Sequence, residues 1–112
     1  MGILHSSKAY VFNLQTTSSA EAKRLWRRDV KKKWNNKCAY CGVDLDFFDI
    51  KQKNWLEIDH IVSKKNNGTH TLKNIIPSCR SCNQSKKNMD MKEWFEKQTF
   101  FSEIKLTKIQ NT

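Results

Sequence analysis

The apolar residues between positions 18 and 37 follow the spacing of an amphipathic helix. They recur every three or four residues along one stripe, which consists of Ala22, Leu25, Trp26, Val30 and Trp34. Ser18 and Glu21 form a capping-box pattern before the stripe, and Asn35 and Asn36 interrupt it. The pattern predicts a helix over 18–37 whose apolar stripe faces the rest of the domain.

Two segments further along the chain predict strands. Residues 55–62 alternate between one face, with Leu56, Ile58, His60 and Val62, and the other, with Trp55, Glu57, Asp59 and Ile61. Asn67 and Gly68 favour a turn, because both residue types tolerate positive φ. Residues 72–77 then predict a second short strand, which the short connection makes antiparallel to the first.

A helical pattern returns after the second strand. Residues 80–88 form a polar helical segment, and residues 91–98 form an amphipathic one with Asp90 as its N-cap. The tail, residues 100–112, fits a strand or a helix equally well. This order of elements predicts an α+β fold.

Positive charge is concentrated in the first helix. The chain has 21 Lys and Arg against 11 Asp and Glu, a formal charge of +10, and residues 23–37 alone hold eight basic side chains and one acidic one. The basic side chains expected to point away from the apolar stripe are Arg24, Arg27, Arg28, Lys31 and Lys32. A cationic helix face suits a phosphate backbone, and the alternative is an ordinary solvated surface.

The composition indicates one small packed domain. The chain has 112 residues, of which 38% are hydrophobic, with one Pro and three Gly. No segment has the length and apolarity of a membrane helix or of a signal peptide, so we expect a soluble intracellular protein. So short a chain has a thin core, and we therefore expect an added cross-link. For the same reason we assign all four tryptophans to core packing: Trp26, Trp34, Trp55 and Trp94.

The four cysteines form two Cys-x-x-Cys pairs, which are candidates for that cross-link. Cys38 and Cys41 make the first pair, Cys79 and Cys82 the second, and Gly42 permits a tight turn after the first. Four thiolates match the tetrahedral coordination of Zn²⁺. Two disulfides or four inert core thiols are the alternatives, but disulfides are typical of secreted chains. We therefore favour a structural zinc site.

Three segments around the cysteine pairs resemble the HNH endonuclease family. They read Ile58-Asp59-His60-Ile61, then Lys73-Asn74-Ile75-Ile76, then Cys79-Arg80-Ser81-Cys82-Asn83. The family signature is an Asp-His dipeptide on a strand, an Asn at the start of a second strand, and a His or Asn on the following helix. The resemblance covers residues 38–90, about half of the chain.

The resemblance implies a ββα-metal (His-Me finger) core: two antiparallel strands and a helix around one catalytic divalent ion. Carried over by position, His60 resembles the general base, Asp59 and Asn83 the ligands of the catalytic ion, and Asn74 the loop-fixing residue that orients the base. An imidazole is suited to taking a proton from water at neutral pH. The implied reaction is hydrolysis of DNA phosphodiester bonds to 5′-phosphate and 3′-hydroxyl ends.

The chain departs from the family pattern in two places. Asn83 stands where a His is common, so both implied ligands offer oxygen, and we expect Mg²⁺ or Mn²⁺. Ser63 follows in place of a Pro-containing turn, which affects the shape of the loop. In addition, Asp59 and His60 would point to opposite faces of a regular strand, so we expect a bulge, a strong twist or a strand end there.

Other polar residues near the signature are weaker candidates. Lys86 and Lys87 follow Asn83 by about one helical turn, and they are expected either to contact the DNA backbone or to be solvated. His70 lies in the expected loop between the strands and lacks an Asp neighbour, so we do not assign it a catalytic role.

The sequence therefore predicts a small, phage-like, metal-dependent DNA endonuclease with a structural zinc site. Its expected parts are an N-terminal segment (1–17), the basic helix (18–37), a nuclease domain with zinc knuckles (38–98) and a C-terminal tail (99–112). The alternative is a non-catalytic zinc module that binds nucleic acid or a protein. A homodimer through residues 100–109, or a place in a larger phage or restriction assembly, stays open.

Overall fold

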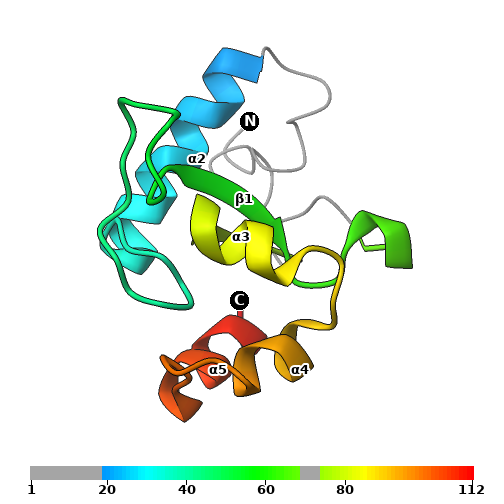
Figure 1. Ribbon diagram of the computed structural model, residues 1–112. Helices are drawn as coiled ribbons and strands as arrows, with labels where there is room; N and C mark the ends of the chain where they lie inside the picture. Colours follow the sequence, from blue (N-terminus) through cyan, green and yellow to red (C-terminus); the bar gives the residue numbers. More distant parts are fainter. Residues whose placement is uncertain (1–18, 69–73) are drawn as a thin grey trace.

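The computed structural model describes residues 19–68 and 74–112. In chain order its elements are α2 (Ser19–Trp34), β1 (Leu56–His60), the 3₁₀ helix η3 (Lys64–Asn66), β2 (Ile75–Cys79), α3 (Arg80–Lys86), α4 (Met91–Glu96) and α5 (Glu103–Gln110). Figure 1 shows α3 in front of β1, α2 above the strand, and α4 and α5 below it. The fold is the predicted small α+β arrangement with a ββα unit at its centre.

The sheet consists of β1 and β2, paired antiparallel in a continuous register from Leu56 opposite Cys79 to His60 opposite Ile75. Both strands differ from the predicted ranges. β1 ends at His60, two residues short of the prediction. β2 runs on to Cys79, beyond the predicted end at Pro77. Residues 72 and 73, where the second strand was expected to begin, lie outside the described residues.

Pro77 sits in the middle of β2 without weakening the pairing. Its carbonyl accepts a hydrogen bond from the Ala39 N–H at 3.0 Å. In an antiparallel ladder, the N–H and C=O of one residue point to the same edge. The donor that proline lacks therefore falls on the edge away from β1, and the segment around Ala39 docks against that edge.

α2 places its apolar stripe as the sequence predicts. Trp26 and Val30 are buried in the core, and Leu25 and Trp34 pack against it partly exposed. The helix ends at Trp34, before the predicted end at residue 37. Asn35 and Asn36 follow with φ of 53° and 57°, and Asn is the residue type besides glycine that adopts this left-handed conformation most readily. The predicted cap at Ser18 lies outside the described residues.

The C-terminal half forms three short helices. Asp90 accepts a hydrogen bond from the Glu93 N–H at 3.0 Å, which confirms it as the cap of α4. The predicted helices over 80–88 and 91–98 end early, the first because Lys87 takes φ of 51°. The ambiguous tail contains α5, which buries Leu106 and Ile109. Among the described residues, no helix is long and apolar enough to cross a membrane.

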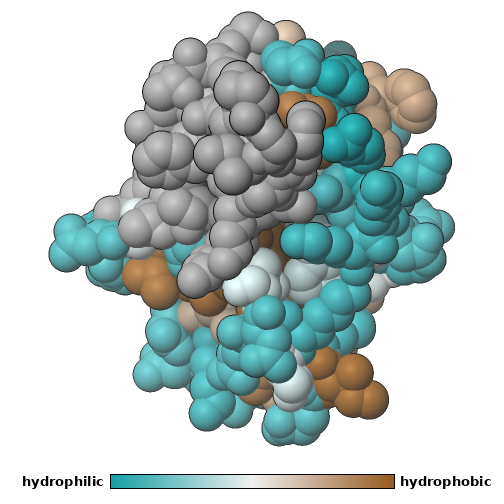
Figure 2. Space-filling view, turned by 180° about the vertical axis from the view of Figure 1, so that it is seen from behind, coloured by the Kyte–Doolittle hydropathy of each residue, from teal (hydrophilic) through white to brown (hydrophobic). Residues whose placement is uncertain are grey.

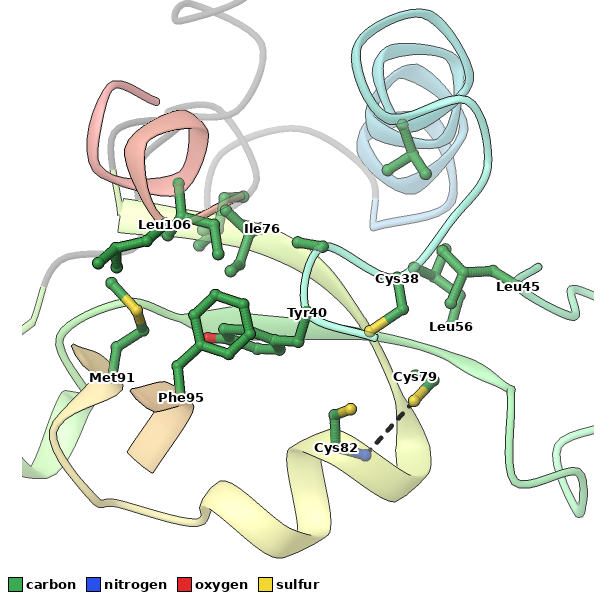
Figure 3. Packing of buried hydrophobic residues seen from close by; sticks show 14 of the residues in the cluster. Cys38, Tyr40, Leu45, Leu56, Ile76, Cys79, Cys82, Met91, Phe95 and Leu106 are labelled. Carbon is green, nitrogen blue, oxygen red and sulfur yellow. Dashed lines mark hydrogen bonds between the residues drawn. The ribbon is translucent and has the colours of Figure 1, made fainter. Parts of the chain in front are cut away.

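Aromatic side chains fill the core between the sheet and α4. Phe95 is fully buried, and its ring meets the rings of Tyr40 and Phe101 edge-on, with centroids 5.2 and 5.0 Å apart. Figure 3 shows Tyr40 and Phe95 side by side, near Met91 and Leu106. Seen from behind, the surface outside the grey residues is mostly hydrophilic, with apolar side chains in small separate patches (Figure 2).

Two of the four tryptophans are core residues, as predicted. Trp26 and Trp94 are buried, whereas Trp34 and Trp55 are half-buried.

We predict that Phe95→Ala lowers the free energy of unfolding by about 3–5 kcal/mol, because it removes a buried ring and leaves a cavity. Phe48→Ala is the matched control, since Phe48 is 94% exposed, and it should change the free energy by less than about 0.5 kcal/mol. Urea denaturation followed by circular dichroism measures both. Equal effects of the two substitutions would contradict the core described above.

Candidate active site and metal centre

The two cysteine pairs meet in one cluster. The Sγ atoms of Cys38, Cys41, Cys79 and Cys82 all lie within 4.8 Å of one another, and those of Cys41 and Cys79 are 3.8 Å apart. Sulfur atoms bonded to one tetrahedral Zn²⁺ at about 2.3 Å are separated by about 3.8 Å, whereas a disulfide needs about 2.05 Å. Figure 3 shows the sulfur atoms of Cys38, Cys79 and Cys82 turned toward one another.

Backbone hydrogen bonds bring the two pairs together. The Ala39–Pro77 bond holds the first pair beside β2, the strand that leads into the second. Gly42 closes the first knuckle with φ of +78° and donates its N–H to the Cys38 carbonyl at 3.0 Å. In the second knuckle, the Cys82 N–H donates to Cys79 Sγ at 3.4 Å.

The chemistry of the cluster suits a dication. All four cysteines are free thiols. The hydrogen bond from Cys41, followed by those from the other two thiols, lowers the pKa of Cys38 far below its ordinary value. The hydrogen bond to Cys38 and burial raise the pKa of Cys41 and Cys82 far above theirs. Since zinc binds thiolates and displaces their protons, the donor set and the sulfur separations fit Zn²⁺.

A second site, which offers oxygen ligands, lies where β1 ends. An open depression of about 220 Å³ is lined by Ile58, Asp59, His60, Ser63, Lys65, Asn83, Lys87 and Asn88. It therefore brings together three residues of the signature: Asp59 and His60 from β1 and Asn83 from α3. Asp59 and His60 pair in continuous register with Ile76 and Ile75, so the expected bulge is absent, and both residues line the depression where β1 ends.

Asn74 holds the chain just after His60. Its Oδ1 accepts the Val62 N–H at 2.8 Å, and its Nδ2 donates to the Val62 carbonyl at 2.9 Å. The Asn74 carbonyl accepts the Ile61 N–H at 2.8 Å. Three bonds from one buried residue thus hold the three peptide groups that follow His60.

Asp59 is buried, with 4% of its surface exposed, and is held by groups from two other segments. Tyr40 donates its hydroxyl proton to Asp59 Oδ2, and Lys86 Nζ lies 3.3 Å from Asp59 Oδ1. Burial raises the pKa of Asp59 above its ordinary value, and the Lys86 charge and the Tyr40 hydrogen bond oppose that rise. Two of about four acceptor positions on the carboxylate are used by these bonds, and Asp59 is among the residues that line the depression.

Glu57 orients Asn83, a role that the motif does not reveal. Asn83 Nδ2 donates to Glu57 Oε1 at 2.7 Å, and Arg80 Nε lies 3.4 Å from Glu57 Oε2. With its nitrogen held by Glu57, the amide of Asn83 has its Oδ1 to offer to a cation. The alternation that put Glu57 and Asp59 on the same face of the strand was the signal for this contact.

The donor set of the depression fits a hard divalent cation. Asp59 and Asn83 supply a carboxylate and an amide oxygen from two different elements, and Mg²⁺ and Mn²⁺ prefer oxygen ligands.

Both alternatives predicted for Lys86, contact with the DNA backbone and solvation, are wrong in this structure. Its side chain is fully buried, and its ammonium bonds to Asp59 and, at 3.1 Å, to the His60 carbonyl. Lys87, the C-cap residue of α3, has a positive φ of 51° and is exposed. Lys87 and Lys65 both line the depression, and the Ser63 hydroxyl is buried there without a hydrogen-bond partner among the described residues.

The predicted basic face of α2 is exposed along its length, at Arg24, Arg27, Arg28, Lys31 and Lys32. Arg24 forms an ion pair with Glu21 at 2.7 Å, and Arg27 lies over the ring of Phe47. α2 meets the start of β1, where Trp26 and Leu56 line a shared hollow. The start and end of this strand are about 13 Å apart. His70 lies outside the described residues.

Comparison with known proteins gives a consistent family. Residues 38–89 match the family model described as HNH endonuclease. A protein of Bacillus subtilis strain 168, whose name describes it as an HNH endonuclease derived from the SPbeta prophage, is 34% identical over 88 residues, which are 76% of this chain and 38% of that protein. No solved structure matches the chain significantly.

Two further relatives match shorter stretches of this chain. The CRISPR-associated endonuclease Cas9 of Corynebacterium diphtheriae is 38% identical over 71 residues, 62% of this chain and 6% of that protein. The Septu protein PtuB of Bacillus thuringiensis is 34% identical over 61 residues, 53% of this chain and 22% of that protein. The chain thus spans well under half the length of each relative.

The hairpin, helix and cysteine cluster occupy the same residues that match the family model. This chain therefore carries an HNH endonuclease domain.

Proposed function

We propose that the protein is an endonuclease that hydrolyses phosphodiester bonds in DNA, with His60 as the general base. One observation supports this most strongly: Asp59, His60 and Asn83 line one open depression. A zinc module that only binds would have no need to gather an imidazole and two oxygen ligands at one surface.

His60 takes the proton of the attacking water in this proposal. A neutral imidazole is well matched to that task near pH 7. Asn74 is the positioning residue for the base. Its side chain bonds the N–H and the carbonyl of Val62, and these bonds limit how the end of β1 can move.

Asp59 and Asn83 would hold Mg²⁺ or Mn²⁺. The bound cation would stabilise negative charge on the scissile phosphate and on the departing 3′ oxygen. Because the 3′ oxygen departs, the products would have 5′-phosphate and 3′-hydroxyl ends. Lys65 and Lys87, on the rim of the depression, would attract the flanking phosphates. The four cysteines would hold a structural Zn²⁺.

The exposed cations of α2 would supply most of the sequence-independent contact with DNA. This contact would lie near the start of β1, where α2 packs, whereas the depression lies toward the end of the same strand. Ile58, in the middle of β1, lines both the hollow beside α2 and the depression. The binding energy from such contacts comes largely from counterion release and weakens as salt rises.

We predict that His60→Ala reduces Mg²⁺-dependent nicking of a plasmid by at least about 100-fold, since general-base catalysis contributes about 10²–10⁴-fold. His70→Ala is the control with the same chemical change and should cleave like the wild type. Equal nicking by His60→Ala and the wild type would contradict the assignment. If the wild type nicks no plasmid across salt and metal conditions, the alternative of a non-catalytic zinc module is favoured. Activity with Zn²⁺ or Ni²⁺ but not with Mg²⁺ would contradict a cation site made of the oxygen ligands Asp59 and Asn83.

The cysteine cluster generates a second prediction. The purified chain should contain about one zinc ion, measured by mass spectrometry of the metal, and Cys82→Ser should lose zinc and unfold at a lower temperature. Ser81→Ala, at the exposed neighbouring position, should keep the zinc content and the unfolding temperature of the wild type. Full zinc content in Cys82→Ser, or none in the wild type, would refute a four-cysteine zinc site.

A third prediction separates the helix from the rest of the basic surface. Changing Arg28, Lys31 and Lys32 to Gln should weaken DNA binding and lower the slope of log K against log salt by up to about 3, because each phosphate contact contributes about 0.9. The charge-matched control changes three exposed lysines elsewhere, Lys51, Lys92 and Lys97. Fluorescence anisotropy with duplex DNA at several salt concentrations measures both. Equal slopes in the two triple variants would show that α2 is not the main contact.

A further inference from the structure

Asp59 is held by a buried set of polar groups that the endonuclease signature does not include. Its two carboxylate oxygens are bonded by different segments: Tyr40, between the first two cysteines, bonds Oδ2, and Lys86, in the last turn of α3, bonds Oδ1. The Lys86 ammonium also donates to the His60 carbonyl at 3.1 Å. The three side chains therefore connect the first cysteine pair, β1 and α3.

Packing leaves Tyr40 little freedom. It is fully buried, and its ring lies edge-on to those of Trp94 and Phe95, with centroids 4.9 and 5.2 Å away. Its carbonyl accepts a hydrogen bond from Lys105 Nζ of α5 at 3.0 Å. The position of its hydroxyl is thus set by the cysteine knuckle and by the aromatic core.

Stability alone is a weak explanation for this arrangement. Burying an ammonium and a carboxylate removes both from water, and apolar side chains of similar size often stabilise a fold as well or better. A carboxylate with one hydrogen bond on each oxygen, in contrast, is fixed in one orientation and still has acceptor positions left. That state is the one a metal ligand needs, because fixing a ligand beforehand lowers the cost of binding.

We propose that Tyr40 and Lys86 are positioning residues that hold Asp59 in the orientation needed to bind the catalytic cation. Through Tyr40, the cysteine cluster then determines the geometry of the cation site as well as the stability of the domain. This inference rests on the proposed function, since it takes Asp59 and Asn83 as the cation ligands.

Mn²⁺ affinity of the zinc-loaded full-length chain tests the proposal without relying on cleavage. Tyr40→Phe removes one oxygen atom and keeps the ring. It should weaken Mn²⁺ binding at least about tenfold, because loss of a group that orients a metal ligand costs about 10–100-fold. Its zinc content and circular dichroism spectrum should match those of the wild type. Tyr10→Phe, the same change at the only other tyrosine, should bind Mn²⁺ like the wild type.

Asn83→Ala separates this inference from the proposed function. Calorimetric titration with Mn²⁺ should show weaker binding by Asn83→Ala than by the wild type. Equal binding by these two would overturn the cation site itself. A clear loss in Asn83→Ala with wild-type affinity in Tyr40→Phe would overturn only the role of Tyr40.

A second measurement keeps the hydroxyl group at position 40. In Tyr10→Phe labelled with 3-fluorotyrosine, the single ¹⁹F resonance belongs to position 40. Titration with Mg²⁺ should shift that resonance with the same midpoint as Mg²⁺ binding, because the hydroxyl contacts the ligand carboxylate. A resonance that stays in place while Mg²⁺ binds would overturn the proposal.

Discussion

The meeting of four sulfur atoms within 4.8 Å of one another is the constraint on which the rest of this structure depends. The cluster joins Cys41 to Cys79, between which lie the whole of β1 and nearly all of β2. Because the Ala39–Pro77 hydrogen bond docks the first knuckle on β2, closing the cluster also sets where the Tyr40 side chain enters the core. In a chain too short for a large core, one cross-link thus positions both the sheet and a contact to Asp59.

Buried polar contacts carry the same constraint into the candidate site. Tyr40 and Lys86 hold Asp59, and Glu57 holds the amide nitrogen of Asn83. Each contact joins elements that are distant in sequence, so the positions of the two proposed ligands depend on the packing of α3 against the hairpin. If these polar side chains served only to keep the protein in solution, they would lie at the surface, where water satisfies their hydrogen bonds.

Several features of the fold and of the candidate site could be predicted from sequence, because local patterns indicate them. They are the apolar stripe of α2, the cap at Asp90, the cysteine pairs and the family signature. The failures have a common physical cause. Nothing local distinguishes Lys86 from the exposed Lys87, because the difference is the buried Asp59 opposite one of them. For the same reason, nothing local marks Tyr40, between Cys38 and Cys41, as a partner of Asp59. The position of the chain after His60 is held by Asn74, whose side-chain bonds to Val62 span 12 residues of sequence.

We propose that Asp59 and Asn83 form a cation site separate from the cysteine cluster. The most direct measurement is a crystal structure of the zinc-loaded protein soaked in Mn²⁺, with anomalous scattering recorded at the absorption edges of both metals. The account predicts zinc among the four sulfur atoms and manganese in bonding contact with oxygen atoms of Asp59 and Asn83, beside His60. Manganese bound elsewhere, or zinc at both positions and manganese at neither, would contradict it.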